Sequence, residues 1–211
     1  MWPTDRRISL RDEAALQEPV FASAGEPFAL VAHSYGAAVA LVTALARPDR
    51  IRALALYEPT LFALLDAESP PRPNDAEGIR GAVAGAAAAL DAGNPALAAE
   101  CFIDYWMGPG AWARMPEPRK GPIARSIVNV GGWANALFGE EAPLQAFAAV
   151  DVPTLCMIGK DSPASSRGVA RLLTRTLPQV QVIEFEGLGH MGPITHPEIV
   201  NEAIAHFLER G

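Results

Sequence analysis

The sequence has few cysteines and no excess of basic residues, and both shortages narrow the range of functions. Only Cys101 and Cys156 occur in 211 residues, far apart in the chain. Neither a disulfide framework nor a cysteine-based metal site is therefore indicated. Lysine and arginine total 17 against 24 aspartate and glutamate residues, which gives a net charge of -7. A nucleic-acid partner is not expected, because no surplus of positive charge is present to meet phosphates.

The N-terminus also lacks the apolar stretch of a signal peptide. It reads Met-Trp-Pro-Thr-Asp-Arg-Arg and is followed by mixed polar sequence, so we expect a cytoplasmic protein. Hydrophobic residues make up 50% and charged residues 19% of the chain, which is typical of a globular protein and not of a disordered one. The length allows one domain with a real core, or one domain with a subdomain.

The rest of the chain is organised around an apolar run that turns into a helix at one serine. Residues 28–32 have the length of a buried strand, and a helix rich in alanine is expected to end near Ala46. Ser34 lies between them, with the small residues Ala32 and Gly36 two positions to either side. Small side chains let strand and helix come close at such a turn, and the serine hydroxyl is then exposed at the edge of the sheet.

This stretch has two other interpretations. The residues Ala-His-Ser-Tyr-Gly would also suit an ordinary strand-to-helix loop whose serine has no catalytic role. That alternative stays open until the rest of the sequence is considered. A membrane span over residues 28–46 would be nearly long enough. The polar residues 33–35 in its middle argue against a span, so no membrane partner is expected.

Four short apolar runs predict an α/β fold with a mostly parallel sheet and flanking helices. A helix that begins at Ser9 and ends at Gly25 precedes the first of these runs. Because strands alternate with helices, the connections are expected to be right-handed parallel crossovers. The expected strands cover residues 28–32, 51–57, 152–158 and 180–185.

The middle of the chain differs in character from both ends. Prolines and glycines cluster at residues 70–73 and 108–110, between segments rich in alanine that predict helices. An inserted helical cap is therefore indicated, and not more sheet. We expect a first core part (1–61), the cap (62–149) and a second core part (150–211). The expected cap helices cover about 76–92, 95–107, 123–137 and 141–149.

Two further side chains follow strands in an order that suits nucleophilic catalysis. Asp161 follows the third expected strand, and His190 lies in the loop after the fourth. The carboxyl ends of parallel strands share one edge, so both are expected near Ser34. A catalytic serine needs an imidazole to accept its proton and a carboxylate to hold that imidazole. Glu58, which ends the second expected strand, is a rival to Asp161 as this carboxylate.

Each of these residues also has a purely structural interpretation. Asp161 stands among turn-forming residues and could serve the turn alone. His190 could pack within its glycine-rich loop. His190 and His196 could together bind a metal ion, but no third ligand follows at a suitable spacing. No metal is therefore expected.

Together these motifs resemble those of the α/β-hydrolase family. The turn around Ser34 is similar to the G-x-S-x-G nucleophile elbow, with Ala32 in place of the first glycine. The segments GKDSPASSRGVARLL and VIEFEGLGHMGPITHPE look like the acid and histidine loops of that family. The resemblance covers about 5–61 and 150–209 and implies a partial α/β-hydrolase fold. It implies that His190 activates Ser34, that Asp161 orients His190, and that the Tyr35 N–H is an oxyanion-hole donor.

The resemblance implies a hydrolase that uses a Ser-His-Asp triad, without a cofactor, on an ester-like carbonyl of a small molecule. Trp106, Trp133 and Met191 are candidates for the substrate pocket, although the aromatic residues could equally pack the cap helices together. Two alternatives remain. One is a binding or remnant protein that keeps the fold without turnover. The other uses the same triad for carbon–carbon bond hydrolysis or cofactor-free perhydrolysis.

The family normally has several strands before the elbow, and a loop among them supplies the second oxyanion-hole donor. Only 33 residues precede Ser34 here, so we expect Met1 to be a false or shortened start. The source of the second donor stays open. The first strand would have an exposed edge, and a homodimer that covers it is a further alternative.

Overall fold

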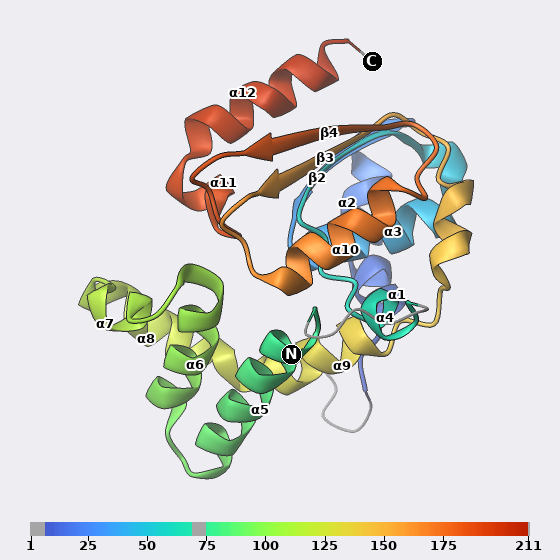
Figure 1. Cartoon of the computed structure of the whole chain (residues 1–211). Coiled ribbons are helices and arrows are strands. Elements are labelled where there is room, and N and C mark those ends of the chain that lie inside the picture. Colours follow the sequence, from blue (N-terminus) through green and yellow to red (C-terminus); the bar gives the residue numbers. More distant parts are fainter. Residues whose placement is uncertain (1–6, 69–74, 211) are drawn as a thin grey trace.

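Four parallel strands form one sheet in the computed structural model, which describes residues 7–68 and 75–210 (Figure 1). The order in the sheet is β1-β2-β3-β4, so each strand pairs with its neighbours in sequence. All four expected strands are confirmed, and the third begins after Pro153, slightly later than expected. The strands are β1 (Phe28–His33), β2 (Ile51–Tyr57), β3 (Thr154–Gly159) and β4 (Val180–Phe185).

Helices cover both faces of the sheet. On one face, α3 (Tyr35–Ala46) and α10 (Ala164–Thr174) pack against side chains of β2 such as Leu54 and Leu56. On the other face, α12 (Pro197–Leu208) covers the neighbouring residues of β2 and β3. Successive strand residues point to opposite faces, and the two apolar layers follow from that alternation. Short helical segments at the ends of strands and helices are η1 (Pro48–Arg50), α4 (Ala63–Asp66) and α11 (Gly192–Thr195).

The expected helix from Ser9 to Gly25 is divided into α1 (Leu10–Leu16) and α2 (Glu18–Ser23). Ser9 caps α1 as expected, since its hydroxyl accepts a hydrogen bond from the Asp12 N–H at 3.2 Å. The break follows from Pro19, which lacks an N–H and is favoured in the first turn of a helix, so a new helix starts there.

The cap helices lie together beyond the carboxyl ends of the strands (Figure 1). The two long helices α5 (Glu77–Asp91) and α6 (Pro95–Met107) pack through alanines, whose small side chains allow a close approach. The expected helix over 123–137 is instead two helices with a 3-10 turn between them. The other elements there are α7 (Ala111–Arg114), α8 (Glu117–Ser126), η2 (Ile127–Asn129) and α9 (Val130–Phe138). The last expected cap helix, 141–149, is instead the 3-10 helix η3 (Leu144–Ala149), which packs on α3 and α10 of the core. The proline cluster at 70–73 lies outside the described residues, as do residues 1–6.

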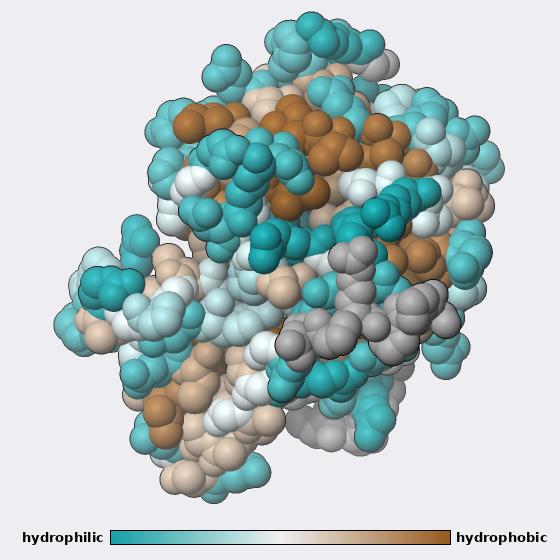
Figure 2. All heavy atoms as spheres, in the orientation of Figure 1, coloured by the Kyte–Doolittle hydropathy of each residue, from teal (hydrophilic) through white to brown (hydrophobic). Residues whose placement is uncertain are grey.

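The surface in Figure 2 is mostly hydrophilic, with a hydrophobic area over the sheet between α10 and α12. Val182 of β4 contributes to the exposed apolar surface. The stretch 28–46, which was nearly long enough for a membrane span, is divided between β1 and α3. Within 7–68 and 75–210, no helix combines the length and apolar character needed to cross a membrane.

One close backbone approach holds the loop that carries His190 against the end of β3. A Cβ atom added to Gly159 would lie 2.9 Å from the Gly189 carbonyl oxygen and closer still to the Leu188 carbonyl group. Because these neighbours are backbone atoms, they cannot turn aside as a flexible side chain would. The glycine at this position therefore sets how near the His190 loop lies to β3.

We expect Gly159→Ala to lower the free energy of unfolding by about 1–3 kcal/mol, as overpacking does. Gly81→Ala is the matched control, because a Cβ there meets nothing within 4 Å and the residue is exposed in α5. This control is expected to raise stability by about 0.5–1 kcal/mol. Urea unfolding of both variants measures the difference. Equal stability of Gly159→Ala and the wild type would contradict the close approach.

Candidate active site

Ser34 lies at the sharp turn between β1 and α3, in a strained backbone conformation. Its φ and ψ are 56° and -120°, a combination that side-chain-bearing residues rarely adopt. The turn is held because the Ser34 N–H donates to the Tyr57 carbonyl at 2.9 Å, and the Ser34 carbonyl accepts from the first turn of α3. The expected steric need for Gly36 is not observed, since among the described residues a Cβ there would meet nothing within 4 Å.

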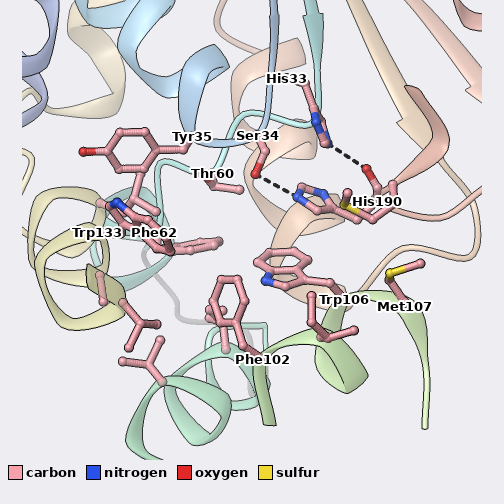
Figure 3. Close-up of a pocket in the computed structure, with 17 residues that line it drawn as sticks. His33, Ser34, Tyr35, Thr60, Phe62, Phe102, Trp106, Met107, Trp133 and His190 are labelled. Atoms are coloured by element: carbon pink, nitrogen blue, oxygen red, sulfur yellow. Dashed lines mark hydrogen bonds between the residues drawn. The ribbon is translucent and has the colours of Figure 1, made fainter. Parts of the chain in front are cut away.

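His190 lies against Ser34 and is almost fully buried, with 2% of its surface exposed. The Ser34 Oγ and His190 Nε2 atoms are 2.8 Å apart (Figure 3). On the other side of the ring, Nδ1 lies 2.7 Å from Oε2 of Glu58. When the ring proton is on Nδ1, this N–H donates a hydrogen bond to Glu58. Nε2 is then free to accept a hydrogen bond from the serine hydroxyl.

The carboxylate at His190 is therefore Glu58, and the expectation that Asp161 occupies this position is corrected. Glu58 is fully buried, and its Oε1 accepts hydrogen bonds from the Gly159 N–H at 2.7 Å and from the Ser162 hydroxyl at 2.5 Å. The Asp161 side chain is exposed, while its N–H donates to the Leu188 carbonyl.

The local backbone explains why Glu58 reaches the imidazole. Its φ of 46° turns the chain sharply just after the end of β2. The Glu58 side chain therefore does not point to one face of the sheet, as it would if the strand continued. Since β2 lies between β1 and β3, its carboxyl end is near both Ser34 and the loop after β3. Asp161 comes two residues after β3 has ended, and by then the chain has turned toward solvent.

Two further contacts fix the loop that carries His190. The Tyr57 hydroxyl donates to the Gly189 carbonyl at 2.8 Å. His33 Nε2 lies 2.7 Å from the His190 carbonyl oxygen (Figure 3). Because a carbonyl oxygen only accepts hydrogen bonds, Nε2 must be the nitrogen of His33 that carries the proton. Burial, together with the nearby His190, lowers the pKa of His33 to about 4, so this ring is neutral at pH 7. Neither contact was predicted from the sequence, although both residues end strands.

An aromatic ring of the cap lies on the imidazole of His190. The rings of Trp106 and His190 are stacked, with centroids 4.0 Å apart and planes 26° from parallel. Trp106 comes from α6 and also contacts Phe62, Phe102 and Tyr105. The cap and the histidine loop thus meet directly at the candidate active site.

A cavity of about 440 Å³ opens beside Ser34 and His190. Its volume is in the range of sites for small organic molecules. The polar residues lie at the end of the sheet, and nearly all the remaining wall is apolar and comes from the cap (Figure 3). The three expected pocket residues, Trp106, Trp133 and Met191, all line it. The other wall residues are His33, Tyr35, Thr60, Phe62, Ile79, Val83, Phe102, Ile103, Met107, Val130, Ala134 and Leu137.

Tyr35 has a different role for its side chain than for its backbone. Its hydroxyl donates to Glu13 of α1 at 2.9 Å, and this bond ties α1 to the start of α3. Its N–H follows Ser34 directly, so its assignment as an oxyanion-hole donor stays a prediction. In the described part of the chain, no group of three or more histidine, cysteine, aspartate or glutamate side chains is arranged to hold a metal ion.

Comparison with known proteins identifies one family and many similar folds. The model of the alpha/beta hydrolase family matches residues 2–203. No curated protein matches the sequence. Among solved structures, a hydrolase from Oleispira antarctica is 17% identical with a TM-score of 0.74, covering 100% of this chain and 76% of that one. The structure of MenH from S. aureus is also 17% identical, with a TM-score of 0.71 and coverage of 100% and 79%.

A third similar structure is a putative non-heme bromoperoxidase from Mycobacterium tuberculosis H37Rv. It is 19% identical with a TM-score of 0.64, covering 95% of this chain and 72% of that one. At these identities the three structures establish the fold and no more.

The neutral state of His33 makes the stability of the protein depend on pH. The ordinary pKa of 6.5 falls to about 4 in the fold, so between these values the unfolded chain binds more protons than the native one. The free energy of unfolding should therefore fall as pH drops from 6.5 toward 4, by about 1–3 kcal/mol from this residue. In His33→Gln, which keeps an N–H for the His190 carbonyl, this part of the pH dependence should vanish.

Urea unfolding at pH 4.5 to 7.5 measures this effect as the difference between the curves of the wild type and the variant. His206→Gln is the control, because His206 is exposed on α12 and should leave the curve unchanged. Parallel curves for His33→Gln and the wild type would show that His33 titrates alike in both states.

Proposed function

The chain belongs to the alpha/beta hydrolase family, and from this premise we propose that it is a serine hydrolase of small apolar esters. The observation that carries the proposal is the unbroken hydrogen-bonded series Ser34, His190 and Glu58, with its serine end open to an apolar cavity. Membership of the family supports hydrolysis in general. The geometry and chemistry of the site support the choice of ester and the role proposed for each side chain.

In the proposed reaction, Ser34 Oγ attacks the ester carbonyl carbon while its proton passes to His190 Nε2. A tetrahedral oxyanion forms, and the Tyr35 N–H donates a hydrogen bond to it from the start of α3. His190 then returns the proton to the leaving alkoxide oxygen, which departs as the alcohol. Water repeats the sequence on the acyl-enzyme and releases the acid.

Glu58 is proposed as the acid of this triad in place of Asp161. Its carboxylate would keep the proton of His190 on Nδ1 and stabilise the imidazolium that forms during attack. Two further donors, the Gly159 N–H and the Ser162 hydroxyl, hold Oε1, so the carboxylate has little freedom to rotate. Such preorganisation lowers the cost of reaching the reactive geometry.

The cavity supports an apolar small molecule as the substrate. Its walls come from aromatic and aliphatic side chains of α5, α6 and α9, so hydrocarbon parts of a substrate would be removed from water there. The alternatives remain distinct. A remnant protein would keep this geometry without turnover, whereas perhydrolysis would replace water by hydrogen peroxide at the acyl-enzyme.

The reactivity of Ser34 is the first test. A fluorophosphonate probe is expected to label the wild type at Ser34, because it needs a serine activated by an imidazole. Ser34→Ala should lose the label and at least about 10³-fold of the turnover of p-nitrophenyl butyrate. Ser126→Ala, which changes an exposed serine of α8, is the control and should keep both. Failure of the folded wild type to react with the probe would exclude the proposal and favour a remnant.

The identity of the acid is a separate test. We expect Glu58→Gln to lower kcat for p-nitrophenyl butyrate by about 10²–10⁴-fold, since the amide cannot hold the reactive tautomer or stabilise imidazolium. Asp161→Asn is the matched control, a similar change on the next loop, and should leave kcat near that of the wild type. Thermal melts of both variants check folding. A large loss in Asp161→Asn with none in Glu58→Gln would reverse the assignment.

A further inference from the structure

The cavity contains a polar group that the proposed reaction does not use, the indole N–H of Trp106. Figure 3 shows the nitrogen edge of this ring turned into the cavity, toward the side on which Phe62 and Phe102 lie. Among the residues that the structure describes, this N–H has no hydrogen-bond acceptor. The side chain as a whole is 8% exposed, and its nitrogen is accessible from the cavity.

The orientation of this N–H is fixed by its surroundings. One face of the indole lies on His190, and three aromatic rings of Phe62, Phe102 and Tyr105 contact it from other directions. The neighbouring Tyr105 is itself held, because its hydroxyl lies 2.6 Å from Ser165 Oγ at the start of α10. The donor is therefore preorganised and does not need to be ordered when a ligand binds.

An unpaired donor in an apolar cavity is unusual, because most buried N–H groups have a partner. The hydroxyl of Thr60 does not add a second donor, because within the described part of the chain its oxygen is fully buried and closed to the cavity that the residue lines. The accessible N–H of Trp106, on a wall that is mostly apolar, points to an occupant that is not purely hydrocarbon.

The geometry points to a substrate ester whose apolar acyl chain carries one hydrogen-bond acceptor, a keto or ether oxygen. This oxygen accepts a hydrogen bond from the indole N–H of Trp106. This inference rests on the proposed function, since Ser34 fixes where the scissile carbonyl lies. Trp106 is then a specificity-determining residue, and a plain alkyl chain of the same length leaves its N–H unpaired. A site built to donate to a substrate oxygen discriminates against the analogue that lacks it.

The kinetic test compares p-nitrophenyl hexanoate with its 4-oxo and 5-oxo derivatives. Each kcat/KM is divided by the rate of the same ester with hydroxide, which removes the inductive effect of the ketone. We expect the wild type to prefer one oxo ester by about tenfold. No preference for either oxo ester would overturn the inference, whatever the activity on the plain ester.

Trp106→Phe keeps an aromatic face on His190 and removes the donor, so the ratio of kcat/KM for the oxo ester to that for hexanoate should fall to about one, whatever the change in hexanoate turnover itself. The matched control is Trp112→Phe. Trp112 is buried to the same degree but packs within the cap, away from the cavity. This control should keep the preference of the wild type. A preference that survives in Trp106→Phe would overturn the assignment of the donor.

Binding separates this inference from the proposed function. In Ser34→Ala, calorimetry with the N-methyl amides of hexanoic acid and of the two oxo acids measures recognition without turnover. Tighter binding of one oxo amide by about tenfold supports the inference even if the wild type hydrolyses no ester, a result that would reject only the proposed function. Equal affinity for all three amides would reject the inference alone.

Discussion

The carboxylate of Glu58, buried and hydrogen-bonded on all sides, is the interaction on which the rest of the structure depends. A buried charge is costly unless donors surround it, and here the donors come from three separate places. They are the end of β3 (Gly159), the turn after it (Ser162) and the loop after β4 (His190). Satisfying this one group therefore brings the carboxyl ends of three strands together. The same hydrogen bonds that make the burial tolerable also orient the imidazole toward Ser34.

The cap completes the site from the opposite side. The sheet edge supplies the polar atoms, whereas the cap supplies apolar walls and the ring of Trp106 against His190. Tyr105 and Ser165 join the cap to α10 close to this contact. The hydrogen bonds around Glu58 thus come from the core, whereas the apolar walls of the cavity come mainly from the cap.

Much of the architecture could be predicted from local pattern. Short apolar runs separated by helical segments predicted the four strands, and the position of Ser34 between a strand and a helix predicted the turn. Failures came where a single residue overrode the pattern. Pro19 divides the first helix, because its missing N–H favours a new start over a continued one. Gly159 had no visible role in the sequence, because the backbone it approaches belongs to a loop about 30 residues away.

The sequence by itself determined that a serine, a histidine and acidic residues end separate strands of one parallel sheet, since strand order and edge follow from chain order and handedness. It left two acids at strand ends, Glu58 and Asp161, and the resemblance of the loop favoured Asp161. Only the tertiary structure decided between them, through a positive φ that turns Glu58 inward and a loop that carries Asp161 outward. The physical reason is that side-chain direction at a strand end depends on a few backbone angles, which are set by contacts between segments distant in the sequence.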